Sequence, residues 1–470
     1  MTVADYLVAE LAESHRAYRE RNPQSRIAYE NALAYLPGGN TRTVIHADPF
    51  PLTFVKGERS TLISIDGHKY IDLLGEFSAG IFGHSDHRIA NAITDAMTRG
   101  WNYGGACTYE KELARKACER FGPSGLELVR FTNSGTEANT VAIATALNIT
   151  KRKKILVFSS GYHGGTLVFP LSLMKGEMEA PMNLPHDFVY APYNNISETR
   201  EILCQLPQDS LAAILVEPVQ GSGGCRPADR KFLQFLRTEA DERKALLIMD
   251  EVMASRLGYS GYSASIGIRA DIITFGKYLG GGMTIGAFGG RRDIMELFDP
   301  TKSKLFHPGT YNNNVFSMAA GITGLNIYDE SEVERLNKLG EELKQDIQTI
   351  LMRHSIYPDS FPSPSAGLME IDSLQAGTTT AYTDYYPNQS ILLPSMFVTG
   401  CGSMLNVRFS GPEAPTWQAL FYHHMLERNI NIAVRGYTPL NLHVSASDCR
   451  AYLESIEAFV IKHKAMLTLL

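Results

Sequence analysis

Short apolar runs alternate with helical stretches through the middle of the chain, from about residue 88 to residue 330. Six of these runs are strand-like, at residues 129–135, 154–161, 211–219, 244–252, 271–277 and 284–290. Strands that are apolar along nearly their whole length are typical of a parallel sheet that is covered on both faces. Several of the runs end in polar or glycine-rich residues, and in open α/β sheets ligands bind at the carboxyl ends of the strands.

The beginning of the chain follows a different pattern. Residues 1–36 have apolar positions at helical spacing, and Pro37-Gly38-Gly39 follows them, which predicts a helix closed by a breaker. Strand candidates follow at 51–58 and 60–74, and the second turns at Asp66-Gly67.

A long helix is predicted from about residue 331, and it leads into a mixed C-terminal segment. We expect a large domain over residues 61–330 and a smaller domain over 331–470, to which residues 1–60 contribute. The Pro/Ser/Thr-rich stretch at 357–394 is expected to be a surface excursion.

The amino-acid composition of the chain limits the kinds of partner that we expect. The chain has 470 residues, 44% of them hydrophobic and 20% charged, and a net charge of -6. This balance gives no indication of a polyanion partner, so we expect no nucleic acid. The six cysteines are scattered without a CxxC pair, which favours reduced thiols over a disulfide framework or a metal site. No apolar run approaches the roughly 20 residues of a membrane helix, and the first residues do not resemble a leader. We therefore expect a cytoplasmic protein.

The sequence FTNSGTEAN (131–139) follows a predicted strand and begins a helix-forming run. Ser134, Gly135 and Thr136 would place free N–H groups, two hydroxyls and the positive end of the helix dipole at one point, which suits a phosphate. A Ser/Thr helix cap is the alternative interpretation of the same residues. The motif is neither a P-loop nor GxGxxG, so it does not indicate a nucleotide.

Three further strand ends carry candidate groups. Asp250 closes a nearly apolar run, and a carboxylate there needs a partner such as a protonated ring nitrogen; an acidic turn is the alternative. Tyr162, in GYHGG, is flanked by glycines and could lie flat over a planar ligand. Glu217 ends another run and is a weaker candidate for binding the cofactor; pairing with a neighbouring cation is the alternative.

Lys277 lies between an apolar run and a glycine cluster, 277 − 250 = 27 residues after Asp250. That interval fits one helix and one strand, which places Lys277 at a neighbouring strand end. A partly desolvated lysine can form a Schiff base with an aldehyde, whereas an exposed lysine at a strand end is the alternative. Together, a phosphate cradle, a stacking ring, a carboxylate and an amine are the attachment points of pyridoxal 5′-phosphate.

The chain resembles the class III aminotransferases, which are fold-type-I enzymes dependent on pyridoxal phosphate. The matching stretches are FTNSGTEAN, GYHGG, LVEPVQG, MDEV, TFGKYLGGGMTIGAFGG and HPGTYNNN. The resemblance implies an α/β fold with a mostly parallel seven-stranded sheet and a smaller α+β domain.

The resemblance also implies roles for single residues. It makes Lys277 the Schiff-base lysine and Asp250 the partner of the pyridine nitrogen. Tyr162 would stack on the ring, Gly135 and Thr136 would bind the phosphate, and Thr310 would reach the phosphate from the neighbouring subunit of a homodimer. Ping-pong transamination follows, with Lys277 moving the proton.

The substrate residues are suggested by one subgroup, the β-phenylalanine aminotransferases. Arg42 in PGGNTRTV matches the arginine that holds the carboxylate of the β-amino acid, and Arg435 matches the one that accepts the α-keto acid, such as pyruvate or 2-oxoglutarate. Glu76 and Phe77 would line the pocket, with Glu76 pairing with an arginine when no carboxylate is bound. Phe77 stands where that subgroup has tyrosine, so a carboxylate-free amine is an alternative donor.

Three other classes of protein share part of this pattern. A glutamate-1-semialdehyde aminomutase shares GGGMxxGAFGG, but its carboxylate arginine lies further beyond the PGG than Arg42 does. A non-catalytic protein of the same fold is disfavoured by the intact set of Lys277, Asp250 and Thr136. A nucleotide-binding protein is disfavoured by the missing phosphate-loop motifs.

Overall fold

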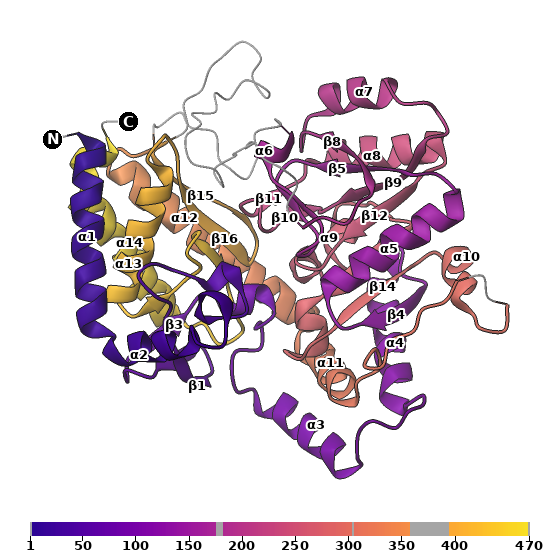
Figure 1. Cartoon of the computed structure of the whole chain (residues 1–470), viewed down its shortest axis with the longest axis horizontal. Coiled ribbons are helices and arrows are strands. Elements are labelled where there is room, and N and C mark those ends of the chain that lie inside the picture. Colours follow the sequence, from indigo (N-terminus) through magenta and orange to yellow (C-terminus); the bar gives the residue numbers. More distant parts are fainter. Residues whose placement is uncertain (1, 175–181, 303–304, 358–393, 469–470) are drawn as a thin grey trace. The chain divides into compact units, whose positions relative to one another are not determined.

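The computed structural model describes residues 2–174, 182–302, 305–357 and 394–468 (Figure 1). The chain divides into two compact units. Unit 1 comprises residues 1–86 and 338–470, and unit 2 comprises residues 87–337. Apart from its end residues Tyr357 and Pro394, the stretch predicted to be a surface excursion lies outside the described residues.

Unit 2 is built on a seven-stranded sheet in the order β4-β14-β13-β12-β9-β5-β8. Its strands are β4 (Leu128–Thr132), β14 (Gly286–Gly290), β13 (Ile272–Gly276), β12 (Leu246–Asp250), β9 (Leu211–Val216), β5 (Lys154–Phe158) and β8 (Asp187–Ala191). Strand β14 is antiparallel to both of its neighbours, whereas the pairs β13–β12, β12–β9, β9–β5 and β5–β8 are parallel. This confirms the fold-type-I α/β prediction and all six predicted strands; β8 is the strand that the prediction missed.

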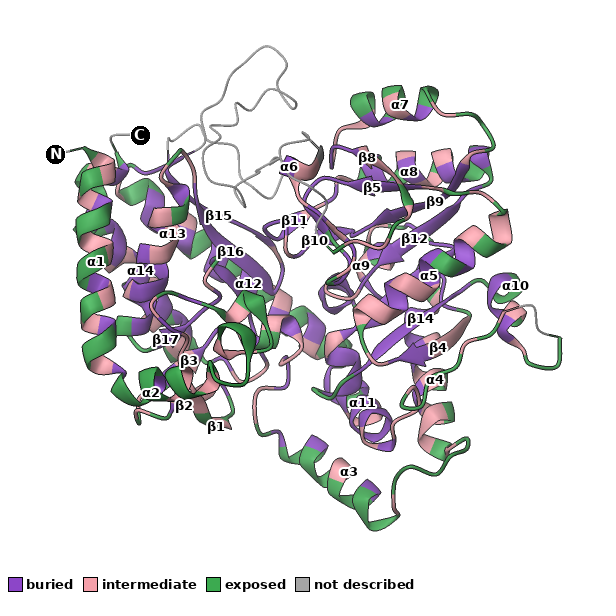
Figure 2. Ribbon diagram, in the orientation of Figure 1, coloured by how far each residue is buried: buried purple, intermediate pink, exposed green. Residues whose placement is uncertain are grey.

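The sheet is covered on both faces, because every residue of β9, β12, β13 and β14 is buried (Figure 2). Helix α5 (Gly135–Thr150) contacts β14, β13, β9 and β12 through small side chains such as Ala138, Ala142 and Ala146. Helix α8 (Arg230–Arg243) contacts β12 and β9 and buries Phe232 and Leu236. The longer helices α3 (His87–Thr98), α4 (Thr108–Phe121), α7 (Ile196–Cys204) and α11 (Val315–Ile327) complete the unit.

Strand pairing brings three carboxyl ends together. Gly286, at the start of β14, pairs with Thr132 at the end of β4 and with Gly276 at the end of β13. Asp250, at the end of β12, pairs with Thr274 of β13. The segments that follow β4, β12 and β13 therefore leave the sheet at one edge.

Unit 1 begins with two helices where one was predicted. Helix α1 (Val3–Arg21) ends at Asn22, and α2 (Pro23–Ala32) begins with a proline. Proline has no N–H to donate and fits the first position of a helix, so the chain starts a new helix there. The predicted strands and the turn at Asp66-Gly67 are confirmed as β1 (Phe54–Glu58), β2 (Thr61–Ser64) and β3 (Lys69–Asp72).

The C-terminal part of the chain completes unit 1. Strand β17 (Ile430–Asn431) pairs in parallel with β3, so the two ends of the chain share one sheet. A second sheet contains β15 (Met396–Cys401), β16 (Met404–Phe409) and β18 (Tyr437–Pro439). The long helices are α12 (Glu330–Arg353), which begins in unit 2, α13 (Ala414–Glu427) and α14 (Ala446–Leu467). Within the described ranges, no helix combines the length and the apolar character needed to cross a membrane.

Candidate active site

A buried hydrogen-bond network joins the candidate elements of unit 2. Asp250 Oδ2 accepts a hydrogen bond from Asn139 Nδ2 of α5 at 2.8 Å, and His163 Nδ1 lies 2.7 Å from the same oxygen. Asn139 Oδ1 in turn accepts from Thr274 Oγ1 of β13 at 2.7 Å. All four side chains are buried. The carboxylate is therefore fixed in place by groups from α5, from β13 and from the GYHGG segment.

Lys277 leaves the sheet three residues after Thr274, at the end of β13. Its side chain is half-buried, and its backbone φ is +52°, in the left-handed region that residues other than glycine rarely occupy. Such backbone conformations are concentrated at functional sites. Lys277 is thus neither fully exposed nor in a relaxed turn. This favours a lysine that forms a Schiff base over an exposed lysine at a strand end.

The predicted phosphate cradle is the N-terminus of α5. Ser134 is the N-cap, and its hydroxyl accepts from the N–H of Glu137 at 3.1 Å, so the helix-cap interpretation is correct for this side chain. Gly135 and Thr136 occupy the first helical positions, whose N–H groups have no acceptor within the helix. Ser134 therefore caps the helix, while Gly135 and Thr136 provide the N–H groups that could bind an anion.

The GYHGG segment packs directly against this helix end. Gly164 has a φ of +126°, and a Cβ added there would lie 2.3 Å from Thr136 Oγ1. Tyr162, two residues earlier, is in the exposed class, as a side chain that stacks on a ligand would be. The contact fixes the segment that carries Tyr162 relative to the N-terminus of α5.

Glu217 anchors the same segment from the other side. Its Oε2 accepts from the N–H of Tyr162 at 3.0 Å, and its Oε1 accepts from the N–H of Gly221 at 3.1 Å. Burial raises the pKa of Glu217 to about 7, and the charge of Asp250 adds to the rise. Two backbone N–H groups therefore hold the Glu217 carboxylate in place.

These groups fit pyridoxal phosphate. The first turn of α5 offers N–H donors that have no acceptor in the helix, the buried carboxylate suits a ring N–H, and an amine follows the adjacent strand. Among the described residues, no group of three or more His, Cys, Asp or Glu side chains could hold a metal ion.

Unit 1 brings together three of the predicted substrate residues. Arg42 Nη1 forms an ion pair with Glu76 Oε1, and the Arg42 guanidinium lies 5.4 Å from the centre of the Phe77 ring. Glu76, Phe77 and Ser78 have φ values of +48°, +52° and +78°. Three consecutive non-glycine residues in this region are unusual, because each costs roughly 1–2 kcal/mol relative to the right-handed conformation.

Arg435 lies in the segment between β17 and β18, and its side chain is exposed. Its role towards the keto acid stays a prediction, as do the other assigned roles.

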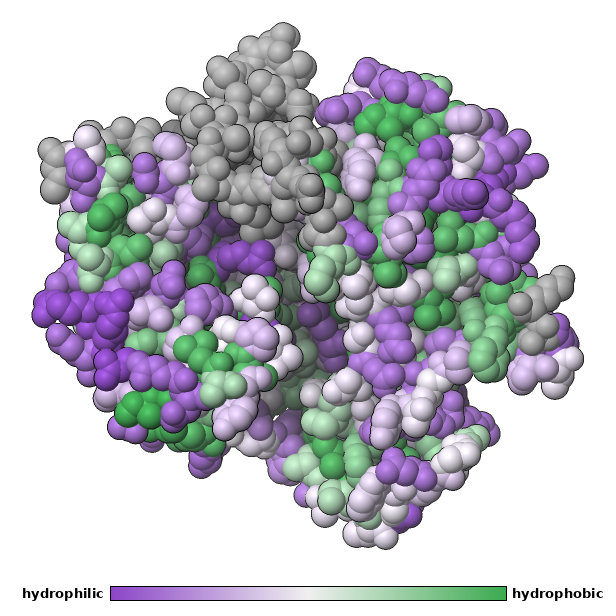
Figure 3. Space-filling view, in the orientation of Figure 1, coloured by the Kyte–Doolittle hydropathy of each residue, from purple (hydrophilic) through white to green (hydrophobic). Residues whose placement is uncertain are grey.

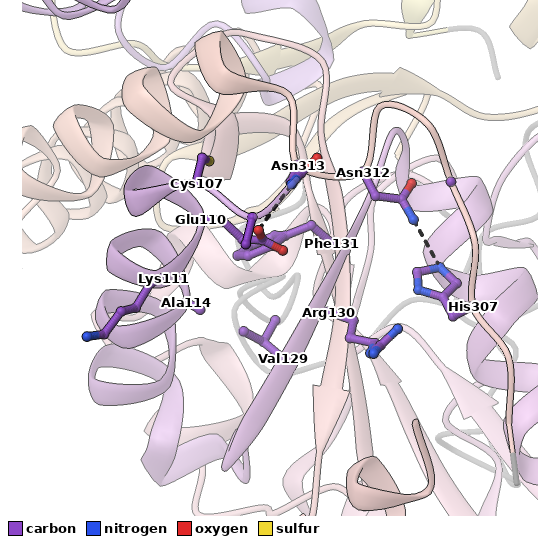
Figure 4. Close-up of a pocket in the computed structure, with 12 residues that line it drawn as sticks. Cys107, Glu110, Lys111, Ala114, Val129, Arg130, Phe131, His307, Asn312 and Asn313 are labelled. Atoms are coloured by element: carbon purple, nitrogen blue, oxygen red, sulfur yellow. Dashed lines mark hydrogen bonds between the residues drawn. The ribbon is translucent and has the colours of Figure 1, made fainter. Parts of the chain in front are cut away.

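Thr310 is exposed on the segment 307–314 of unit 2. A cavity of about 530 Å³ lies beside this segment, lined in part by Glu110, Arg130, His307, Asn312 and Asn313 (Figure 4). Asn313 Nδ2 donates to Glu110 Oε2 at 3.1 Å within it.

Three residues of the network, Thr274, His163 and Asn139, were not predicted. His163 follows Tyr162 directly, and Asn139 lies one helical turn beyond Gly135. A titratable ring within the GYHGG segment was the available signal for His163. Nothing in the sequence singled out Asn139, because its partners come from three separate strands and loops.

Comparison with known proteins matches residues 44–366 to the family described as aminotransferase class III. A β-phenylalanine transaminase from Variovorax paradoxus is 38% identical over 469 residues, which cover 97% of each chain. A glutamate-1-semialdehyde 2,1-aminomutase from Limosilactobacillus reuteri is 34% identical over 340 residues, 69% of this chain and 77% of the relative.

Solved structures agree with these matches. The crystal structure of a β-phenylalanine aminotransferase from Variovorax paradoxus superposes with a TM-score of 0.86 at 37% identity, covering 98% of both chains. An ω-transaminase from Sphaerobacter thermophilus gives 0.79 at 27% identity, covering 95% of this chain and 99% of that one. A transaminase with bound pyridoxal phosphate gives 0.78 at 28% identity, covering 95% and 98%.

Proposed function

The chain belongs to the class III aminotransferases, which depend on pyridoxal 5′-phosphate, and we propose that it transfers the amino group of an aromatic β-amino acid to an α-keto acid. When bound, the cofactor supplies an aldehyde for amines and a protonated ring that accepts electrons from the donor carbon. The residues of unit 2 described above account for its binding, and those of unit 1 for the choice of donor.

Each residue of unit 2 has a separate task in this proposal. The N–H groups of Gly135 and Thr136 hold the phosphate, while Tyr162 covers the ring. Asp250 holds a proton on the ring nitrogen, and His163 and Asn139 keep its carboxylate oriented. Lys277 Nζ is the amine that would bind the cofactor aldehyde, and when free it would take the proton from the donor's amino-bearing carbon.

The observation that carries the donor assignment is the grouping of Arg42, Glu76 and Phe77. A guanidinium beside an aromatic ring offers one group for a carboxylate and one surface for a phenyl ring. Glu76 occupies the guanidinium through their ion pair, and a donor carboxylate would take its place. The name of the relative from Variovorax paradoxus supports the same donor class.

A donor screen tests this assignment. β-Phenylalanine, β-alanine, 1-phenylethylamine and an α-amino acid are each mixed with the holoenzyme, and conversion of the cofactor is followed by its visible absorption. The screen is repeated with Arg42→Ala. Loss confined to the β-amino acids supports the carboxylate clamp, whereas an equal loss with 1-phenylethylamine contradicts it.

A carboxylate-free amine is the second candidate donor, and the ion pair itself favours it. With Glu76 satisfying Arg42, a plain amine can bind without leaving an unpaired cation. In that case 1-phenylethylamine is the better substrate, and Arg42→Ala leaves its turnover unchanged. The same screen separates the two candidates.

An aminomutase is tested without any acceptor. The holoenzyme is incubated with glutamate-1-semialdehyde and no keto acid. Isomerisation under these conditions would replace the aminotransferase proposal.

We also propose that the active form is a homodimer in which Thr310 reaches the partner's phosphate. Large hydrophobic side chains are exposed on two segments of unit 2, with Phe306 and Tyr311 close to Thr310 in the chain and Trp101 and Tyr103 after α3. Figure 3 shows hydrophobic surface over the region of α3 and α11. Patches of this kind mark interfaces between proteins. Light scattering of the wild type and of Phe306→Glu, together with the cofactor affinity of Thr310→Ala, tests the arrangement.

A further inference from the structure

A buried carboxylate in unit 1 holds the unusual turn that carries Glu76 and Phe77. Asp72, the last residue of β3, is 1% exposed. Its Oδ1 accepts from the N–H groups of Leu74 at 3.0 Å and Gly75 at 3.3 Å, the two residues that lead into the turn. Its Oδ2 lies 2.7 Å from His84 Nε2, on the chain leaving the turn. The carboxylate therefore binds the chain on both sides of Glu76 and Phe77.

The same residue ties the turn to the segment that carries Arg435. Asn431 Nδ2 donates to Asp72 Oδ1 at 3.0 Å, and Asn441 Nδ2 donates to the Asp72 carbonyl oxygen at 3.3 Å. These two asparagines enclose residues 432–440. A Cβ added to Gly75 would lie 3.3 Å from the carbonyl oxygen of Pro439 in the same segment. Asp72 thus connects the turn that carries Glu76 and Phe77 with the segment that carries Arg435.

The turn needs such an anchor. Gly75, Glu76, Phe77 and Ser78 all have φ between +48° and +78°, and local sequence preference does not favour this conformation for the last three. Strained conformations persist where the surroundings over-determine them. Within the turn, the N–H of Phe77 donates to Leu74 O at 3.0 Å, and the N–H of Gly80 donates to Gly75 O at 3.0 Å. Both acceptors belong to residues whose own N–H groups bond to Asp72.

We propose that Asp72 is the positioning residue of the donor carboxylate site. Through Leu74, Gly75 and His84 it fixes the turn, and the turn places Glu76 against Arg42 and Phe77 beside the guanidinium. It touches no substrate in this role. The inference rests on the proposed function, in which Arg42 and Phe77 receive an aromatic β-amino acid.

The kinetic test compares Asp72→Ala and Asp72→Asn holoenzymes with the wild type. For Asp72→Ala we expect the KM for β-phenylalanine, relative to the KM for 1-phenylethylamine, to rise at least about fivefold, with kcat for the amine changed less than about twofold. Asp72→Asn keeps one side-chain oxygen that can accept from the N–H groups of Leu74 and Gly75. We expect its ratio of KM values to lie between those of the wild type and Asp72→Ala. An unchanged ratio of KM values would overturn the proposal.

His84 provides a second pair of variants if Asp72→Ala does not fold. His84→Leu removes the partner of Asp72 Oδ2, and His84→Gln retains an N–H donor. We expect His84→Leu to shift the ratio of KM values in the same direction as Asp72→Ala. We expect His84→Gln to have the ratio of the wild type. The matched control is Asp271→Asn in unit 2, another buried carboxylate, which is ion-paired with Arg237 and Arg291. It should lower the melting temperature without moving the ratio.

Hydrogen exchange separates this inference from the proposed function. In the Asp72→Ala protein, peptides covering residues 73–80 should exchange faster, whichever donor the enzyme accepts. A wild type that refuses β-phenylalanine would refute the proposed donor class, while unchanged exchange would refute the role of Asp72 by itself.

Discussion

His163 Nδ1 lies 2.7 Å from Asp250 Oδ2, and both side chains are almost wholly buried. In this geometry the imidazole fixes the orientation of a carboxylate that has one further side-chain donor, Asn139. Removing one hydrogen bond to a buried charged group leaves that charge less well stabilised.

We therefore expect a graded loss of activity at this pair. His163→Phe should lower kcat about tenfold, whereas Asp250→Asn should lower it about 100-fold because the ring nitrogen loses its charged partner. Single-turnover cofactor absorption with a saturating donor measures the chemical step. The cofactor should remain bound in His163→Phe. A wild-type rate in that variant would remove His163 from the site.

Lys277 is expected to be indispensable for repeated turnover. Lys277→Ala should abolish multiple-turnover transamination, since the variant lacks the amine that we propose moves the proton. Borohydride reduction of the wild type followed by peptide mapping should place the cofactor on this side chain.

The chain offers a matched control for this experiment. Lys244 is also a lysine with a left-handed backbone, φ +54°, but it is exposed at the end of α8. Lys244→Ala should therefore keep full activity. Mapping of the adduct to any residue other than Lys277 would contradict the assignment.

Gly164 should be sensitive to a single methyl group. In Gly164→Ala the new Cβ would meet Thr136 Oγ1 at 2.3 Å, at a φ that L-residues rarely adopt. The N-terminus of α5 or the GYHGG segment must then shift, and we expect the dissociation constant for pyridoxal phosphate to rise at least about tenfold. Absorption titration of the apoprotein measures this constant.

The neighbouring glycine is the control. Among the described residues, none apart from its chain neighbours has an atom within 4 Å of a Cβ added to Gly165, and its φ is not left-handed. Gly165→Ala should bind the cofactor like the wild type. Equal losses in both variants would show that the effect is general to the loop.

The positions of the candidate cofactor residues at strand ends were predictable because they follow strands with a strong apolar pattern. Asp250 and Lys277 come at the ends of β12 and β13, whose residues are all buried. Strand β8, with the sequence DFVYA, escaped prediction because its run is short and only its last residue is buried. Edge strands of this kind carry a weak periodic signal.

The turn that carries Glu76 and Phe77 could not be predicted. Left-handed backbone is expected at glycine, and here three other residues adopt it. Its anchor, Asp72, is held by Asn431 and Asn441 from the other end of the chain. Long-range contacts of this kind leave no local pattern in the sequence.

Unit 1 should lose stability in mild acid because it buries neutral histidines. Burial lowers the pKa of His423, His424 and His463 to about 4 in each case. An unfolded histidine has a pKa of about 6.5, so between these values the unfolded chain binds protons that the folded chain does not. Stability therefore falls as the pH drops from about 6.5 to about 4, and His423 alone contributes a slope of at most about 1.4 kcal/mol per pH unit.

Urea unfolding of the holoenzyme at pH 7.5, 6 and 5 measures this slope. His423 Nε2 lies 2.9 Å from the carbonyl oxygen of Asp48, a contact that the amide of His423→Gln can imitate without titrating. The variant should lose less stability than the wild type between pH 7.5 and 5, whatever its stability at pH 7.5. If stability fell equally steeply with pH in the wild type and in His423→Gln, His423 would accept a proton in the folded protein. Its burial among His15, Tyr18 and Tyr422 opposes this.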